Sequence, residues 1–240
     1  MKKEEWIEIL KNQCKNLNMS INENQLEQLH MYMKLLQKCN ESINLTSIIE
    51  DKDILQKHFI DSITIIPYID YKDNIIDVGT GAGFPGIPIK IAREDVKVTL
   101  LDSLNKRVNF MKEVISNLNL SNIQTIHGRA EDIGKNSNFR EKFDVATSRA
   151  VAPLNILVEY LMPLVKKGGR CICMKGKDIK EELEISKKAI NIFGGELEKV
   201  HEFYLPQSNI KRNIIIIRKM KDTPSKYPRK AGTPSKEPIQ

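Results

Sequence analysis

Residues 75–86 read IIDVGTGAGFPG, a short apolar run that contains Asp77 and leads into a turn with four glycines. The apolar run predicts a buried strand, and residues 87–93 after the turn can form a helix that tolerates Pro88 in its first turn. Glycine permits a tight turn and lets a ligand lie against the backbone. The segment therefore predicts a strand, a ligand-binding loop and a helix in succession.

Two classes of ligand fit this loop. The spacing Gly81-x-Gly83-x-x-Gly86 satisfies the dinucleotide pattern, in which a helix N-terminus holds a pyrophosphate. Asp77 favours another ligand, because a carboxylate at the strand end repels pyrophosphate but attracts a cofactor with an ammonium and a sulfonium group, such as S-adenosylmethionine. A purely structural glycine turn is a third interpretation. We expect Asp77 and the backbone at Gly81 to contact S-adenosylmethionine.

Short apolar runs alternate with helical stretches beyond residue 75. Such alternation predicts right-handed crossovers and a parallel, doubly wound sheet. The expected strands lie at residues 75–78, 96–101, 123–126, 143–147 and 170–174, and the expected helices at 104–118, 154–164 and 179–193.

Two further strands, at residues 196–205 and 213–218, are separated by a segment too short for a helical crossover. We therefore expect a hairpin and an antiparallel last strand. This arrangement is typical of the seven-stranded, Rossmann-like α/β fold of methyltransferases, whereas a dinucleotide-dependent dehydrogenase should continue with parallel strands.

The two ends of the chain differ from this central region. Apolar residues recur every three or four positions in residues 7–36, as in amphipathic helices. The last 20 residues carry four prolines and the tetrad TPSK twice, which predicts an extended tail without a core. We expect a helical cap at residues 1–70, a methyltransferase domain at 71–220 and a basic Pro-rich tail at 221–240.

Further candidate cofactor residues follow the later strands. Asp102 ends the second strand, where a carboxylate can accept both ribose hydroxyls; it can also cap the next helix, and the two roles are compatible. Ala130 and Glu131 follow the third strand, whose end borders the adenine in such a sheet, although Glu131 can also be a solvated loop acid. Arg149 follows the fourth strand, where it can face the cofactor, a nucleic-acid phosphate or a neighbouring acid.

Missing motifs narrow the chemistry. The chain lacks the Asn/Asp-Pro-Pro-aromatic tetrad typical of amine methylation, and it lacks a Pro-Cys nucleophile for pyrimidine carbon 5. A ring nitrogen such as guanine N7 has a free lone pair and needs neither base nor nucleophile, so alignment supplies most of the acceleration. No catalytic base is therefore required. The four histidines lack the spacing of metal ligands, and we expect no metal.

The charge of the chain is basic and uneven. The formal net charge is +7, from 38 Lys and Arg against 31 Asp and Glu. Residues 221–240 hold five basic and two acidic residues, a net +3. A basic balance favours a polyanionic partner, and nucleic acid is favoured over a membrane surface because no amphipathic anchor accompanies the charge. No apolar run is long enough to span a bilayer or act as a secretion signal, so we expect a cytoplasmic protein.

Several motifs resemble one family. These are DVGTGAGFPG at 77–86, LDSLNKRV at 101–108, TSRA at 147–150, MKG at 174–176 and the tail TPSKYPRKAGTPSKEP at 223–238, with NLT at 44–46 and HFIDS at 58–62 further upstream. Together they closely resemble the RsmG (GidB) family of 16S ribosomal RNA guanine-N7 methyltransferases. The match spans residue 40 to the end, and FPGIP is unusual among other methyltransferases.

The resemblance implies a class I fold, S-adenosylmethionine as the methyl donor, and direct in-line transfer to one 16S rRNA guanine near the decoding centre. It places Gly79, Phe84, Ala130, Glu131 and Arg149 at cofactor-contacting positions, with Phe84 as a lid or wall.

The expected partner is 16S rRNA or the small ribosomal subunit, bound by a monomer. Lys175 and His58 are expected RNA contacts, as are Arg229 and Lys230 of the tail; Arg149 and Lys175 can orient the base. The alternatives are a non-catalytic RNA-binding assembly factor and, less favoured, an NAD-dependent dehydrogenase.

Overall fold

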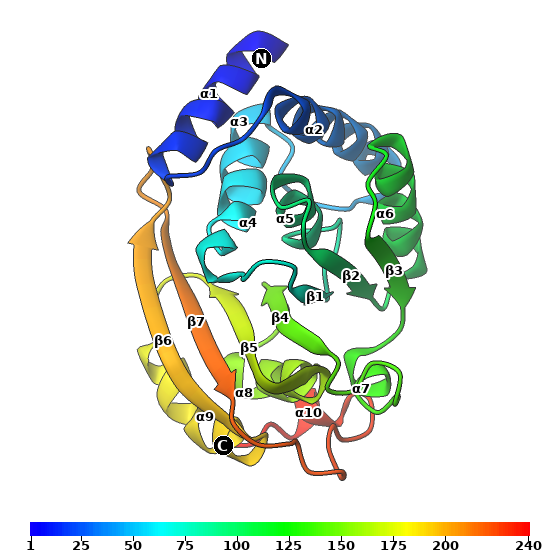
Figure 1. The fold of residues 1–240 in the computed structure, drawn as a ribbon, viewed down its shortest axis with the longest axis vertical. Coiled ribbons are helices and arrows are strands. Elements are labelled where there is room, and N and C mark those ends of the chain that lie inside the picture. Colours follow the sequence, from blue (N-terminus) through cyan, green and yellow to red (C-terminus); the bar gives the residue numbers. More distant parts are fainter.

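A seven-stranded sheet with helices on both faces forms the centre of the molecule, in a computed structural model that describes residues 1–240 (Figure 1). The strand order is β3-β2-β1-β4-β5-β7-β6. The strands are β1 (Asn74–Val78), β2 (Lys97–Asp102), β3 (Ile123–His127), β4 (Phe143–Arg149), β5 (Val165–Lys175), β6 (Gly195–Tyr204) and β7 (Lys211–Lys219).

The expected antiparallel hairpin is confirmed. Strands β1 to β5 pair in parallel, whereas β7 pairs antiparallel with both β5 and β6. The segment between β6 and β7, residues 205–210, is too short for a helix. The sheet therefore has the mixed topology that the sequence predicted.

Both faces of the central strands are buried, and this explains their continuous apolar runs. In β7, Ile214 and Ile216 belong to one hydrophobic cluster, while Ile215 and Ile217 belong to the other. Successive side chains of a strand point to opposite faces, so a run of four isoleucines supplies both cores.

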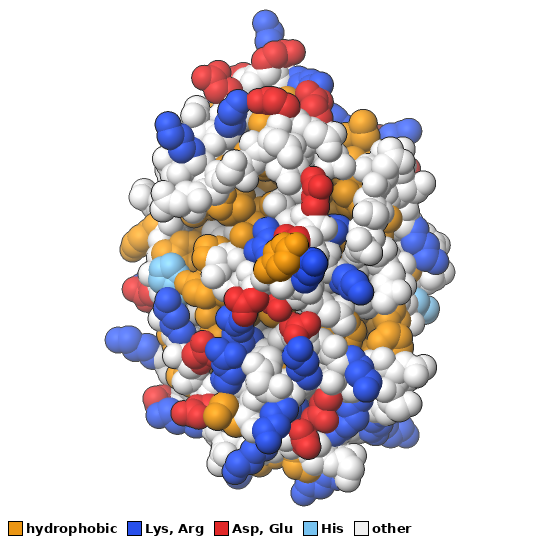
Figure 2. Space-filling view, in the orientation of Figure 1, with side chains coloured by type: hydrophobic (Ala, Val, Ile, Leu, Met, Phe, Trp, Pro, Cys, Tyr) orange, Lys and Arg blue, Asp and Glu red, His pale blue; other side chains and the backbone are white.

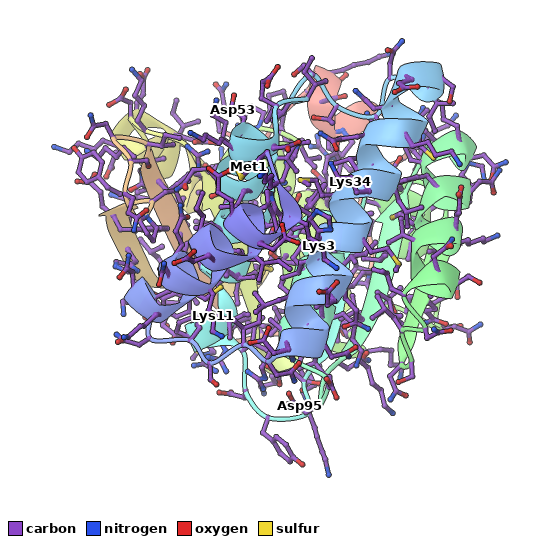
Figure 3. The ribbon with its side chains drawn as sticks, turned by 90° about the horizontal axis from the view of Figure 1, so that it is seen from above. Met1, Lys3, Lys11, Lys34, Asp53 and Asp95 are labelled. Atoms are coloured by element: carbon purple, nitrogen blue, oxygen red, sulfur yellow. The ribbon has the colours of Figure 1, made fainter.

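The first face is covered by helices from the N-terminal region and from the first two crossovers. Helices α1 (Lys3–Asn16) and α2 (Glu23–Ile43) lie at the N-terminal end of the molecule, which Figure 3 shows from above. The N-terminal region also includes α3 (Asp51–Ile54), the π-helical η1 (Leu55–Ile60), α4 (Asp61–Ile63) and η2 (Ile66–Tyr68). The crossover helices are α5 (Gly86–Ala92) and α6 (Asn105–Asn117). Trp6 of α1 packs edge-on against Phe59 of η1, with ring centroids 5.7 Å apart.

The second face is covered by the later crossovers. These contain α7 (Ala130–Ile133), α8 (Leu154–Leu161) with the short η3 (Met162–Leu164), and α9 (Lys180–Ile192). The expected boundaries near residues 70 and 220 fall between η2 and β1 and directly after β7. None of the helices combines the length and the hydropathy that crossing a membrane requires.

The C-terminal tail differs from its expected extended state, because it is packed on the domain and forms a short helix, α10 (Thr233–Lys236). Arg229 donates hydrogen bonds through its backbone N and its guanidinium to Glu159 of α8, whose side chain is buried. The Arg140 guanidinium donates to the carbonyl oxygens of Thr223 and Tyr227. A tail without its own core is thus held by an ion pair to the buried Glu159 and by hydrogen bonds to the domain, which its composition does not reveal.

Candidate active site

The glycine-rich loop between β1 and α5 is organised by Asp77. Its Oδ2 accepts hydrogen bonds from Thr80 Oγ1 at 2.5 Å and from the Gly86 backbone N at 2.8 Å. The side chain is fully buried, Oδ1 has no partner, and burial raises the pKa of Asp77 to about 7. Asp77 therefore joins the two ends of the loop and keeps one unpaired oxygen beneath it.

Gly79 leaves the strand with φ +68°, a conformation that favours glycine. A Cβ at this position would lie 2.6 Å from Val151 Cγ2 in the loop after β4. Gly79 therefore leaves no room for a Cβ beside Val151, a neighbour that the sequence did not indicate.

Asp102 links the loops that follow β1 and β2. Its Oδ2 accepts a hydrogen bond from the Gly81 backbone N at 2.8 Å, and its Oδ1 accepts one from the Leu104 backbone N at 2.9 Å, directly before α6. Arg107 lies 3.6 Å from Oδ2. The carboxylate thus anchors the start of α6 and also faces a cavity.

That cavity has a volume of about 360 Å³ and lies at the carboxyl ends of β1, β2 and β3. It brings together four of the expected cofactor residues: Gly79, Asp102, Ala130 and Glu131. Its other walls include Val151. They also include Ile156 and Tyr160 of α8 and Gly232 of the tail, two elements that the sequence did not assign to the cofactor site. The carboxyl ends of parallel strands are the usual position of a nucleotide site in an open α/β sheet.

A second cavity, of about 520 Å³, adjoins the first, and Gly79 lines both. It contains the expected residues Gly81, Phe84, Arg149, Lys175 and His58. Five cationic side chains line it against the single acid Asp61; they are Lys57, Arg107, Arg149, Lys175 and Arg212. Neither cavity is lined by Asp77.

Arg149 is held by the N-terminal helices. Its guanidinium donates to the Lys57 carbonyl oxygen at 3.0 Å and pairs with Asp61 Oδ2 at 3.1 Å. The other Asp61 oxygen pairs with Arg212 Nε of β7 at 3.0 Å. Asp61 is almost fully buried, so one carboxylate connects the ends of β4 and β7 to α4. The motif HFIDS contains Asp61 but does not by itself indicate this role.

His58 has partners within the protein on both ring nitrogens. Nδ1 lies 3.1 Å from Arg149 Nη2, and Nε2 lies 3.0 Å from Thr46 Oγ1. A guanidinium can only donate, so Nδ1 is the acceptor and the proton is on Nε2. Burial and the Arg149 charge lower the pKa of His58 to about 3. His58, expected as an RNA contact, is therefore a buried neutral side chain at the wall of the cavity.

Phe84 lies between two other rings. Its centroid is 4.4 Å from that of His58 and 5.1 Å from that of Tyr32, and both pairs are stacked. The Tyr32 hydroxyl donates to the Ala82 carbonyl oxygen in the loop. Because Phe84 is only 5% exposed, it forms a fixed wall of the larger cavity.

Lys175 ends β5, at the edge of the sheet where the sequence placed it. Its Nζ donates to Ala152 O at 2.7 Å and to Glu182 Oε1 at 2.6 Å. Glu182 also accepts from the Leu154 backbone N at 2.6 Å. Lys175 thus fixes the loop between β4 and α8 and lines the larger cavity.

The two tail residues expected at the RNA differ from each other. Arg229 is engaged with Glu159, as described above, whereas Lys230 is exposed and has no partner in the protein. Figure 2 shows Lys and Arg side chains spread over the lower part of one face, with Asp and Glu among them.

Comparisons with known proteins agree on one family. The family model described as rRNA small subunit methyltransferase G matches residues 25–215. A ribosomal RNA small subunit methyltransferase G of Alkaliphilus oremlandii is 51% identical over 97% of this chain and 98% of its own length. The protein of the same name from Clostridium botulinum (strain Loch Maree) is 47% identical over 98% of this chain and all of its own length.

Solved structures share the fold at low identity. The structure of M. jannaschii TYW2 in complex with AdoMet superposes with a TM-score of 0.55 at 12% identity, covering 71% of this chain and 77% of that one. A fibrillarin pre-rRNA processing protein of Methanococcus jannaschii gives 0.50 at 19%, covering 63% and 69%.

Proposed function

Because the chain belongs to the GidB family of rRNA small subunit methyltransferases G, we propose that it methylates N7 of one guanine of 16S rRNA near the decoding centre, with S-adenosylmethionine as donor. One observation supports this reaction above all: two adjoining cavities share Gly79, and one contains acids while the other is lined with cations. Such a pair can hold a nucleoside cofactor next to a polyanionic substrate.

The smaller cavity fits the nucleoside part of S-adenosylmethionine. Asp102 offers carboxylate oxygens for ribose hydroxyls, and Glu131 offers them for the edge of adenine. Glu131 Oε1 accepts from Gly232 N at 2.8 Å, but no group of the protein donates to Oε2, although the residue is only 4% exposed. When bound, the cofactor supplies an electrophilic methyl group.

Gly79 and the loop residues Gly81 and Phe84 fit the neighbouring part of the cofactor, where the two cavities meet. Asp77 has an unpaired Oδ1 beneath this loop, and burial raises its pKa to about 7, so a cation bound above the loop would shift this carboxyl toward its ionised form. Asp77 thereby favours a cationic ligand through the loop rather than by lining the cavity. Arg149 borders the same space from β4.

The larger cavity fits the guanine and its flanking phosphates. Five cationic side chains line it. Arg149 and Arg212 are held by Asp61, so these two side chains lose little conformational freedom when the RNA binds. Arg149 and Lys175 are the residues proposed to orient the base. The exposed Lys230 extends the cationic surface along the tail.

The proposed chemistry needs no general base. N7 of guanine carries a lone pair at neutral pH, so the protein's task is to align the base and exclude water. His58 is neutral but faces Arg149 and Thr46 with its two nitrogens, so it leaves no nitrogen for proton transfer. Alignment by the cavity walls is therefore the proposed source of catalysis.

The proposed working form is a monomer. Its proposed place of action is the cytoplasm, where its rRNA substrate is found. A non-catalytic assembly factor with this fold is less favoured, since such a protein has no need of a nucleoside cavity.

A transfer assay tests the proposal. The purified chain, labelled S-adenosylmethionine and small subunits or 16S rRNA from cells lacking this enzyme should give label at one guanine, and S-adenosylhomocysteine should inhibit whereas NAD should not. Tight rRNA binding without transfer to either substrate would support the assembly factor instead.

A further inference from the structure

We propose that the C-terminal tail is part of the cofactor site: the backbone N–H of Gly232 positions Glu131, whose second oxygen receives the amino group of adenine. This inference rests on the proposed function, because it assigns the smaller cavity to the adenosine of S-adenosylmethionine. It concerns a segment whose composition indicated only RNA binding.

The first observation is the contact itself. Gly232 N donates to Glu131 Oε1 at 2.8 Å, and Oε2 accepts no hydrogen bond from the protein. Gly232 has φ +85° and precedes α10, whose Ser235 hydroxyl donates back to the Gly232 carbonyl oxygen at 3.0 Å. The turn that presents this N–H is therefore built locally.

The second observation is that the tail forms a wall of the cavity. Gly232 and Ser235 line it together with Tyr160 of α8. The opposite walls come from β1, β2 and their loops, more than 100 residues earlier in the chain. Without residues 231–235, the side of the cavity next to Glu131 would open to water.

The third observation is how firmly the tail is anchored. Arg229, two residues before Ala231, makes charged hydrogen bonds to the buried Glu159 at 2.6 to 3.1 Å. Asn155 of the same helix donates to Ile239 O at 3.2 Å. The wall residues therefore lie between two anchors on α8, so the position of Gly232 is fixed relative to Glu131.

One hydrogen bond to a carboxylate fixes the orientation of the whole group. Its second oxygen then accepts a hydrogen bond from a ligand without a further loss of side-chain entropy, which a freely rotating carboxylate would incur. The exocyclic amino group of adenine is a donor, and ligands without it leave Oε2 unpaired. Gly232 is thus a positioning residue, and its effect passes through Glu131.

Two nested truncations provide the test. Removing residues 231–240 deletes Gly232 and Ser235 but keeps the Arg229–Glu159 pair, whereas removing residues 236–240 keeps both wall residues. Calorimetry compares two ligands, S-adenosylhomocysteine and its analogue with an unsubstituted purine base. Thermal unfolding monitors the fold of each variant.

We expect the longer truncation to weaken S-adenosylhomocysteine binding about tenfold, as removal of a charged hydrogen bond does, and binding of the purine analogue less than about twofold. The shorter truncation keeps Gly232 and Ser235 but loses the Ile239 anchor, so it should weaken S-adenosylhomocysteine binding less than the longer one. Combined with Glu131→Ala, the longer truncation should weaken binding little further, because both changes remove the same interaction.

Equal effects on both ligands would overturn the inference, because they would indicate a general structural role, and so would unchanged affinity. If the longer truncation does not fold, Glu131→Gln in the full chain provides the test: its amide oxygen stays on Gly232 N, its NH2 then faces the adenine amino group donor to donor, and the preference for S-adenosylhomocysteine over the purine analogue should be lost. A full-length chain that binds no S-adenosylhomocysteine would instead overturn the proposed function itself.

Discussion

Gly79 is the residue at which the two cavities meet, and its surroundings can be tested by a matched pair of substitutions. Gly79 and Gly81 have nearly the same backbone conformation, with φ of +68° and +65°. A Cβ at Gly79 would meet Val151 at 2.6 Å, whereas a Cβ at Gly81 would meet nothing within 4 Å.

We expect Gly79→Ala to weaken S-adenosylhomocysteine binding by at least about tenfold, because the Cβ must displace Val151 into the shared opening of the cavities. Gly81→Ala carries the same conformational strain without the clash and should weaken binding much less. Calorimetry measures both. Equal effects would show that backbone strain, not space beside Val151, limits binding.

The lowered pKa of His58 should make the stability of the protein depend on pH. Its pKa in the folded protein is lowered to about 3, below the unfolded value near 6.5, so the unfolded chain binds the proton more readily between these values. The stability contributed by neutral His58 is therefore complete above about pH 6.5 and is lost as the pH falls through this window.

We expect the free energy of unfolding of the wild type to fall, relative to that of His58→Gln, by up to about 1.4 kcal/mol for each pH unit below 6.5. Denaturant titrations at several pH values measure this difference. If the difference in unfolding free energy between the two proteins stays constant from pH 7 to pH 4, His58 is not a neutral ring held by hydrogen bonds on both nitrogens.

The N-terminal helices cover the sheet and also hold side chains of the larger cavity in place. Asp61 of α4 joins Arg149 of β4 and Arg212 of β7, so these helices fix two of the five cations of the larger cavity. Asp53 of α3 provides a contrast, since it pairs with Lys57 on the surface.

We expect Asp61→Asn to destabilise the protein by about 3 kcal/mol, because it leaves two partly buried guanidinium groups without their counter-ion. Asp53→Asn should change stability by less than about 1 kcal/mol. Chemical denaturation compares the two. Similar small effects would mean that the Asp61 cluster does not hold the helices on the sheet.

The elements also show what the sequence could predict. The expected strands and crossover helices all occur, because continuous apolar runs and helical periodicity report burial directly. The strand expected at residues 170–174 begins earlier, at Val165, since Gly168 and Gly169 interrupt the apolar pattern without interrupting the strand. The expected helix at 154–164 ends as a short 3-10 turn from Met162.

The residues of the candidate site could be predicted where they belong to a short motif at the end of a strand. The loop glycines, Asp102, Glu131 and Arg149 follow strand ends, and such ends meet at one edge of the sheet. Val151, Tyr160 and Gly232 were missed, because their role depends on tertiary contacts. Arg229 was expected at the RNA for its charge, but its buried partner Glu159 lies 70 residues away.

For the whole molecule, the question is how its net charge of +7 is used. The tail lysines Lys226, Lys230 and Lys236 are exposed, whereas Arg229 is paired. Their side chains can therefore be neutralised without removing the tail from the smaller cavity.

We expect the triple substitution of these lysines by alanine to weaken rRNA binding and to reduce the slope of log affinity against log salt by about 0.7 to 0.9 for each phosphate that is no longer neutralised. Lys2, Lys11 and Lys15, exposed at the opposite end around α1, are the matched control and should leave the slope unchanged (Lys11 is labelled in Figure 3). Filter binding at several salt concentrations measures this. An unchanged slope for the tail variant would assign RNA binding to the larger cavity alone.

The central question for this protein is which atom of the rRNA receives the methyl group. Chemical scission at 7-methylguanine, mapped along 16S rRNA from cells with and without this gene, measures that most directly. We predict one cleavage near the decoding centre that disappears on deletion and returns with the intact gene but not with a Gly79→Val variant. Persistence of the cleavage after deletion would contradict the account.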